Sequence, residues 1–184
     1  MSKLQTPFRY DFVGSFLRPQ VLKDAKAAYR EGKITKEAFD KVADEEITKV
    51  VAKQKELGFH AITDGEFRRT FWHLDFMWGF DGVAHENTGN GVKFDAELAV
   101  LDDTYLVGKI KAKAHPFVEY FKFLKQFEDE NTVAKYTIPA PAQTFQQMIV
   151  PANFANTRKF YHTNEELIQD IGKAYQDVIK QFYD

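Results

Sequence analysis

The chain has 184 residues, and its 25 basic and 27 acidic side chains give a net charge of −2, so no strong field attracts nucleic acid or an anionic membrane. It contains no cysteine, which excludes disulfides and gives no sign of secretion. No stretch approaches the roughly 20 apolar residues of a membrane span, and the N-terminus lacks an apolar signal core. We therefore expect a cytoplasmic protein that forms a single domain over residues 1–184.

The first expected elements are a strand over residues 8–13 and a loop over residues 14–19. A Gly-Ser loop between a strand and a helix offers backbone N–H groups to an anion such as a carboxylate. Pro19 is well placed to open the following helix, which we expect to run to Glu31 and to end at Gly32.

A long helix comes next, with Thr35 as its predicted N-cap and a mostly apolar stripe from Phe39 to Leu57. Gly58 is typical of the residue that follows a helix end. Residues 59–63 then form a short apolar run, as buried parallel strands do. A strand, helices and a second strand in this order favour a parallel sheet of the α/β class.

Asp64, Gly65 and Glu66 follow that second strand directly. In α/β folds the end of a strand lies at the rim where ligands bind. Two carboxylates are costly inside a core unless they have partners, so their position indicates a site. The alternative is that Asp64 caps a turn and Glu66 is solvated, and the residues alone leave both interpretations open.

The regular pattern breaks between residues 68 and 114, where residues 71–80 include five large aromatic side chains. We interpret this segment as a packed excursion over the rim, and the alternative is a wall of a substrate cleft. Within it, Gly89-Asn90-Gly91 is typical of a hairpin turn, and residues 104–110 are predicted to be one of the hairpin strands.

Helical spacing returns after Pro116 and continues to Phe127. Residues 133–138 are the third expected strand, which ends at Pro139-Ala140-Pro141 because proline breaks strand pairing. The last expected helix covers residues 165–183, with Thr163 or Asn164 as its cap.

The five histidines are scattered and form neither H-x-x-x-H nor H-E-x-x-H. His60 lies in a strand pattern, so we expect it to be packed. His115 precedes Pro116, so we expect it at a helix terminus. With no cysteine and no histidine cluster, we predict no complete metal site in these residues.

Three segments carry a family resemblance: Val13-Gly14-Ser15-Phe16, Asp64-Gly65-Glu66 and Thr137-Ile138-Pro139-Ala140-Pro141. In this order and spacing they resemble the C-terminal catalytic barrel of cobalamin-independent methionine synthase and its short single-barrel relatives. The resemblance runs over nearly the whole chain but covers only about the N-terminal half of the barrel. It implies an α/β fold, a (β/α)8 TIM-type barrel represented by roughly its first half, with three barrel strands and a β-hairpin excursion.

The resemblance implies a zinc-dependent methyltransferase that moves a methyl group from a folate-like donor to the thiol of homocysteine and gives methionine. This chain would supply the amino-acid-binding half and would be inactive alone. The family holds its zinc through residues of the second half of the barrel, so we expect no metal ligand here. The Arg-Cys pair with which the family helps to hold its folate is absent. The open edges of a half-barrel could also join copies into a homo-oligomer.

Site residues follow from the same resemblance. Gly14 and Ser15 would contact the carboxylate of the amino acid, and Glu66 would bind its ammonium through a charge-assisted hydrogen bond. Asp64 and Arg69 are further candidates for the same site. Phe145 falls where the family places a tryptophan that stacks on the pterin, although a plain packing role is the alternative. We predict no residue of this chain to be catalytic.

Two alternatives remain at this point. One is another enzyme on a related barrel, either uroporphyrinogen-decarboxylase-like or another thiol alkyltransferase. The other is a truncated, non-catalytic interaction protein. A reading frame that continues to a later His-x-Cys would favour an enzyme, whereas a stop codon directly after Asp184 would favour the interaction protein.

Overall fold

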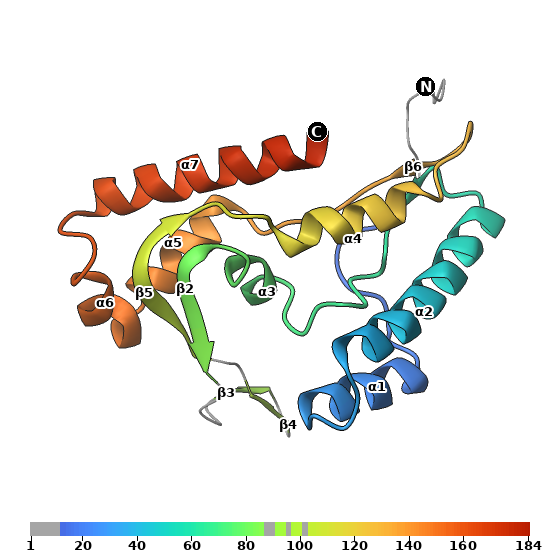
Figure 1. Cartoon of the computed structure of the whole chain (residues 1–184), viewed down its shortest axis with the longest axis horizontal. Helices are drawn as coiled ribbons and strands as arrows, with labels where there is room; N and C mark the ends of the chain where they lie inside the picture. Colours follow the sequence, from blue (N-terminus) through green and yellow to red (C-terminus); the bar gives the residue numbers. More distant parts are fainter. Residues whose placement is uncertain (1–11, 87–90, 95–96, 101–102) are drawn as a thin grey trace. The chain divides into compact units, whose positions relative to one another are not determined.

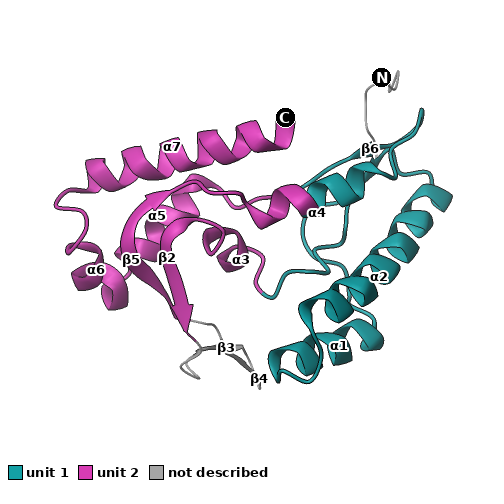
Figure 2. Ribbon diagram, viewed as in Figure 1, with its two compact units in different colours: residues 1–70, 120–137 teal, residues 71–119, 138–184 magenta. Residues whose placement is uncertain are grey.

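The structure is a computed structural model that describes residues 12–86, 91–94, 97–100 and 103–184 (Figure 1). It contains both helices and strands and belongs to the α/β class. The residues divide into two compact units, the first formed by residues 1–70 and 120–137 and the second by residues 71–119 and 138–184 (Figure 2). We describe each unit by itself, and the single domain expected from the sequence stays a prediction.

The first unit is built on two helices and a pair of parallel strands. The helices are α1 (Gln20–Arg30) and α2 (Lys36–Glu56), and the strands are β1 (Ala61–Ile62) and β6 (Val133–Ala134). Ala61 lies opposite Val133 in the parallel register. The core of the unit is apolar and consists of Leu22, Phe39, Ala43, Ile47, Val51, Ile62, Phe67 and Leu124.

The helix boundaries of this unit confirm the sequence predictions. The Thr35 hydroxyl accepts the N–H of Ala38 at 3.2 Å and caps α2, and Gly58 has the left-handed φ of +80° expected beyond a helix end. The strands are shorter than predicted: residues 59–63 contribute only Ala61–Ile62 and residues 133–138 only Val133–Ala134. The strand predicted over residues 8–13 falls mostly outside the described residues.

The second unit combines antiparallel strands with helices. Strand β2 (Asp81–Glu86) pairs with β5 (Asp103–Lys111), and β3 (Gly91–Phe94) pairs with β4 (Glu97–Val100). The strand predicted over residues 104–110 is confirmed as β5. Two residues of the predicted turn, 89 and 90, lie outside the described residues.

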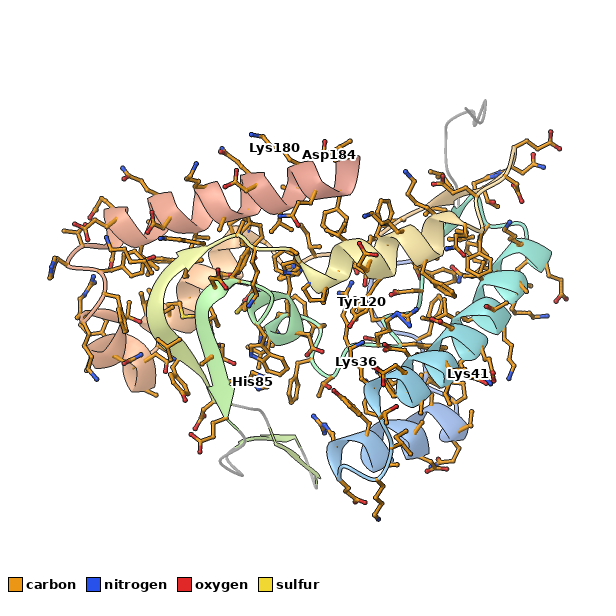
Figure 3. The ribbon with its side chains drawn as sticks, in the orientation of Figure 1. Lys36, Lys41, His85, Tyr120, Lys180 and Asp184 are labelled. Atoms are coloured by element: carbon orange, nitrogen blue, oxygen red, sulfur yellow. The ribbon has the colours of Figure 1, made fainter. Side chains whose placement is uncertain are left out.

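The helices of this unit are α3 (Leu74–Met77), α5 (Pro141–Ile149), α6 (Pro151–Thr157) and α7 (Asn164–Tyr183). Another helix, α4 (Pro116–Lys125), has its first residues in this unit and its last in the other. Thr163 caps α7 as predicted, by accepting the N–H of Glu166 at 3.2 Å. Figure 3 shows Lys180 on the outer face of α7, which leaves the apolar face to the core.

The aromatic run of residues 71–80 is largely packed, as the first of its two interpretations predicts. Phe76 and Phe80 are fully buried, and both rings contact Tyr175 of α7, at centroid distances of 5.1 and 5.4 Å. Trp72 is the exception, because about half of its surface is exposed. Within the described residues, no helix combines the length and the apolar character needed to cross a bilayer.

Candidate functional site

The segment after β1 makes a tight turn through two left-handed residues. Gly65 has φ +63° and Glu66 has φ +57°, and Glu66 is the one non-glycine residue with positive φ among those described. Two short side chains bond to the backbone of this turn: Thr63 Oγ1 accepts the N–H of Gly65 at 3.2 Å, and Asp64 Oδ1 accepts the N–H of Glu66 at 2.9 Å. Asp64 therefore caps the turn, as one interpretation of the sequence predicted.

The carboxylate of Glu66 is the centre of a buried hydrogen-bond network. Its side chain is almost fully enclosed, so the prediction of a solvated Glu66 is wrong. Ser15 Oγ donates to Oε2 at 2.5 Å. Thr137 Oγ1 and Arg69 Nη1 both donate to Oε1, at 2.9 and 3.1 Å. Three segments that are distant in sequence thus meet on one carboxylate.

Arg69 supplies the opposite charge. Its guanidinium is 2% exposed, and its Nη2 donates to the carbonyl oxygen of Thr137 at 2.5 Å. The guanidinium carbon lies 5.0 Å from the centroid of the Tyr136 ring, within cation–π range. A buried carboxylate is tolerated when such a partner and further donors surround it. Arg69 and Glu66 therefore form a buried ion pair.

Basic side chains also bind the carbonyl oxygens of the turn. Arg18 Nη2 donates to the carbonyls of Glu66 and Arg69, at 3.0 and 3.2 Å. Lys26 Nζ, from α1, donates to the carbonyl of Arg69 and lies 3.4 Å from those of Phe67 and Arg68. These contacts fasten the turn to the loop before α1 and to α1 itself. No periodic pattern in the sequence indicates Arg18 or Lys26, because such patterns do not link residues so far apart.

Gly14 lies beside this network in the loop that carries Ser15. It has φ +97°, and among the described residues, its chain neighbours aside, no atom lies within 4 Å of the position that a side-chain carbon would take. The neighbouring Phe16 donates its N–H to the carbonyl of Gly65 at 3.1 Å. The predicted residues Gly14, Ser15, Asp64, Glu66 and Arg69 are therefore gathered in one unit, with open space beside Gly14.

Burial raises the pKa of two further groups in the network. Desolvation raises the pKa of Asp64, while Arg69, the hydrogen bond from the Glu66 N–H and Arg68 oppose that rise. Burial and the neighbouring Asp64 raise the pKa of Tyr136 well above its ordinary value. Tyr136 therefore stays a neutral phenol, and Glu66 is the site's carboxylate with a direct cationic partner.

Phe145 lies in the second unit, on α5, where its side chain is half-buried. Its assignment to a pterin stays a prediction. His60 is exposed, with Nδ1 2.9 Å from the carbonyl oxygen of Asn131, so the prediction of a packed His60 is wrong. The residue lies just before the two-residue strand β1, and residues 56–58, which precede it, are exposed as well.

His115 lies at the start of α4, as predicted, and is buried. Its Nδ1 accepts the N–H of Phe117 at 3.2 Å, and its Nε2 lies 2.9 Å from the carbonyl oxygen of Phe76. These contacts define a neutral imidazole that donates from Nε2. Burial lowers the pKa of His115 to about 4.

The residues present do not fit a zinc site. The chain has no cysteine, and the described part of it contains no group of three or more His, Asp or Glu side chains that could hold a metal ion. What the network offers is a charged, fixed carboxylate next to a Gly-Ser loop. That arrangement can bind a small cation such as an ammonium group.

Comparisons with known proteins point to one family. Residues 10–95 match the family described as the catalytic domain of cobalamin-independent synthase. YxjH of Bacillus subtilis, which is described as uncharacterized, is 36% identical over 180 residues, or 98% of this chain and 46% of that protein. The methionine synthase of Sulfolobus acidocaldarius is 26% identical over 177 residues, covering 94% of this chain and 47% of the relative.

A solved structure agrees with these matches. It is a protein of Listeria monocytogenes described as a candidate vitamin-B12-independent methionine synthase, and it is 36% identical to this chain. The superposition has a TM-score of 0.72 and covers 97% of this chain and 49% of the Listeria protein. The chain thus spans about half the length of the relatives that it matches over almost its whole length.

Proposed function

The chain belongs to the cobalamin-independent methionine synthase family, and on that premise we propose that it is the amino-acid-binding half of a cytoplasmic methyltransferase. The complete protein would transfer a methyl group from a folate-like donor to the thiol of homocysteine and release methionine. It would thus act as a 5-methyltetrahydropteroylglutamate–homocysteine S-methyltransferase. The residues of this half would bind and orient the amino acid, which accelerates a reaction without breaking a bond.

The hydrogen bond between Ser15 and Glu66 is the observation that carries this proposal, because it joins two segments on which the family resemblance rests. A carboxylate oxygen can accept about two hydrogen bonds. Oε1 of Glu66 accepts two, from Thr137 and Arg69, whereas Oε2 accepts one from the described residues, that of Ser15. The remaining position on Oε2 would take the substrate ammonium, and the Gly14-Ser15 backbone would take the substrate carboxylate.

The proposed fold of the complete protein is a (β/α)8 barrel. The parallel pair β1 and β6 would be two neighbouring barrel strands, and residues 8–13 would form a third. The other half of the barrel would come from residues outside these 184. If this half occurs alone, its open edges would favour association of copies.

Zinc would belong to the complete protein. Because the chain has no cysteine and its described residues do not fit a zinc site, the ligands would lie outside the chain, and activation of the thiol would not depend on the network around Glu66. Phe145 would stack on the pterin of the methyl donor. Because the zinc ligands would lie outside the chain, this half alone would bind an amino acid thiol without methylating it.

Binding of homocysteine to the purified chain tests the proposal. The matched comparison is 4-mercaptobutyrate, which has the same thiol and carboxylate but no ammonium. We expect homocysteine to bind at least about tenfold more tightly, since a hydrogen bond between charged groups contributes roughly 1.5–3 kcal/mol. The signals of Ser15 and Glu66 should shift in a nuclear magnetic resonance titration. Equal affinity for the two thiols, or shifts elsewhere only, would overturn the proposal.

A further inference from the structure

Gln54 is a buried amide on the mostly apolar inner face of α2. Only 3% of the residue is exposed, and Ile47 and Val51 of the same face belong to the core. A primary amide in such surroundings is unfavourable unless its donors and acceptor are all used. The hydrogen-bond partners of Gln54 therefore indicate its structural role.

The partners of Gln54 lie on the last residue before Asp64. Oε1 accepts the N–H of Thr63 at 2.9 Å, and Nε2 donates to the carbonyl oxygen of the same residue at 2.8 Å. Nε2 also lies 3.2 Å from the carbonyl oxygen of Val50, in its own helix. One side chain thus satisfies both backbone groups of Thr63.

Strand geometry explains why a side chain is needed there. The carbonyl of Ile62 accepts the N–H of Lys135, so Ile62 is directed toward β6. Successive residues of an extended chain direct their backbone groups to opposite edges, so Thr63 is directed away from β6. The Gln54 side chain bonds to the backbone N–H and carbonyl of Thr63, as a neighbouring strand would do in a sheet.

The fixed residue Thr63 begins the turn that presents Glu66. Its hydroxyl accepts the N–H of Gly65, and Asp64 next to it accepts the N–H of Glu66. Glu66 has φ +57°, a conformation that costs a non-glycine residue roughly 1–2 kcal/mol and persists only where its surroundings impose it. The direction of the Glu66 carboxylate therefore depends on where Thr63 is held.

We propose that Gln54 is a positioning residue for the amino-acid site: its amide holds Thr63 and so fixes the turn that directs Glu66 toward Ser15. This inference rests on the proposed function for the identity of the ligand. Gln54 itself touches no substrate. Its effect would reach the ligand through Thr63, the turn and the Glu66 carboxylate.

Three variants separate positioning from mere packing. Gln54→Met keeps the length of the side chain and removes all of its hydrogen bonds to Thr63. Gln54→Glu keeps an acceptor for the Thr63 N–H but cannot, when ionised, donate to the Thr63 carbonyl. Val51→Ala is the matched control, because it weakens the same buried face of α2 and leaves the hydrogen bonds between Gln54 and Thr63 in place.

Each variant is measured in the purified chain for melting temperature, for homocysteine affinity and for the hydrogen-exchange rates of the Gly65 and Glu66 amides relative to that of Ile47. For Gln54→Met we expect at least a tenfold loss of affinity and at least a tenfold faster relative exchange at Gly65 and Glu66, since small misplacements of a binding group have effects of about this size. Val51→Ala should lower the melting temperature but leave the homocysteine affinity and the relative exchange rates of Gly65 and Glu66 unchanged. Gln54→Glu should fall between wild type and Gln54→Met.

A relative exchange and an affinity in Gln54→Met that match those of Val51→Ala would overturn the proposal. If Gln54→Met does not fold, Gln54→Glu carries the same comparison. Failure of the proposed function would look different, because wild type itself would then not bind homocysteine. The exchange rates would still decide whether Gln54 positions the turn.

Discussion

Ser15 Oγ lies 2.5 Å from Glu66 Oε2, although 51 positions separate the two residues. The bond joins the loop before α1 to the turn after β1. On its other oxygen, Glu66 accepts hydrogen bonds from Arg69 and Thr137. Glu66 is therefore both the proposed ligand-binding group and a structural link between three segments.

Glu66→Gln should lower stability as well as ligand affinity. The amide cannot balance the charge of Arg69, which is 2% exposed, and removing one partner of a buried ion pair costs about 3–5 kcal/mol. Because glutamine keeps part of the hydrogen bonding, we expect a fall in the free energy of unfolding near the lower end of that range. Urea denaturation measures it, with Glu56→Gln as a control because Glu56 is paired only at the surface. Equal stability of the two variants would show that the pair with Arg69 is not needed for folding.

Acidification should destabilise the second unit through His115. Burial lowers its pKa to about 4 in the folded protein, while an unfolded histidine titrates near 6.5. Between these values the unfolded chain binds more protons, so the free energy of unfolding falls as the pH drops from 6.5 toward 4. On this basis, His115 lowers the free energy of unfolding at pH 5 by about 2 kcal/mol relative to its value well above pH 6.5.

Denaturation of wild type and His115→Gln at pH 7 and pH 5 checks this prediction. Glutamine does not titrate, so the variant should lose less stability on acidification than wild type by about that amount. His162→Gln, at an exposed histidine, should follow wild type. Parallel losses in wild type and His115→Gln would contradict the prediction.

The sequence predicted those features whose causes are local. Thr35 and Thr163 cap helices through bonds that span three residues, and Gly32 and Gly58 follow helix ends with positive φ, so each leaves a short-range signal. The position of Glu66 directly after a buried strand can likewise be predicted from the residues next to it. Family resemblance added Gly14 and Ser15, which the loop composition alone would have left as a weak signal.

The sequence did not reveal what depends on tertiary contacts. Arg18 and Lys26 bind carbonyls more than forty positions away. Gln54 falls on the mostly apolar stripe from Phe39 to Leu57, but the sequence pattern gives no sign of its bonds to Thr63. The sequence pattern does not predict helices α5 and α6, although each begins with proline, at Pro141 and Pro151, a residue that is favoured at the first helical position. Pro141 also fits the end of a strand, which is the interpretation that we give it from the sequence.

Tyr161→Phe should destabilise the second unit. The Tyr161 hydroxyl accepts the N–H of Ile110 at 2.7 Å and donates to Asp170 Oδ2 at 2.9 Å. Ile110 is 2% exposed, so removing the hydroxyl leaves a buried N–H without a partner, at a cost of about 1–3 kcal/mol. Urea denaturation should show this loss, whereas Tyr183→Phe, at a tyrosine that is 88% exposed, should differ little from wild type. Two indistinguishable variants would mean that the bond to Ile110 contributes nothing.

Gly65→Ala should disturb the site more than Gly58→Ala, although both glycines are left-handed. Gly65 has φ +63° and Gly58 has φ +80°, so alanine pays a similar backbone penalty of roughly 1–2 kcal/mol at each. The surroundings differ, because a side-chain carbon on Gly65 would lie 3.0 Å from ring atoms of Phe16 and Phe67, whereas at Gly58 no atom of the described part of the chain, apart from the neighbouring residues, lies within 4 Å.

The crowding at Gly65 should cost about 1–3 kcal/mol beyond the backbone penalty. It should also move Phe16, whose N–H bonds to the Gly65 carbonyl and whose neighbour is Ser15. We therefore expect Gly65→Ala to lose more free energy of unfolding than Gly58→Ala and to be the one of the two that loses affinity for homocysteine. Urea denaturation and titration of both variants measure these differences. If Gly65→Ala kept wild-type affinity while losing stability, the contact between the Gly14-Ser15 loop and the turn would serve the fold alone, and Glu66 would not need that contact to bind its ligand.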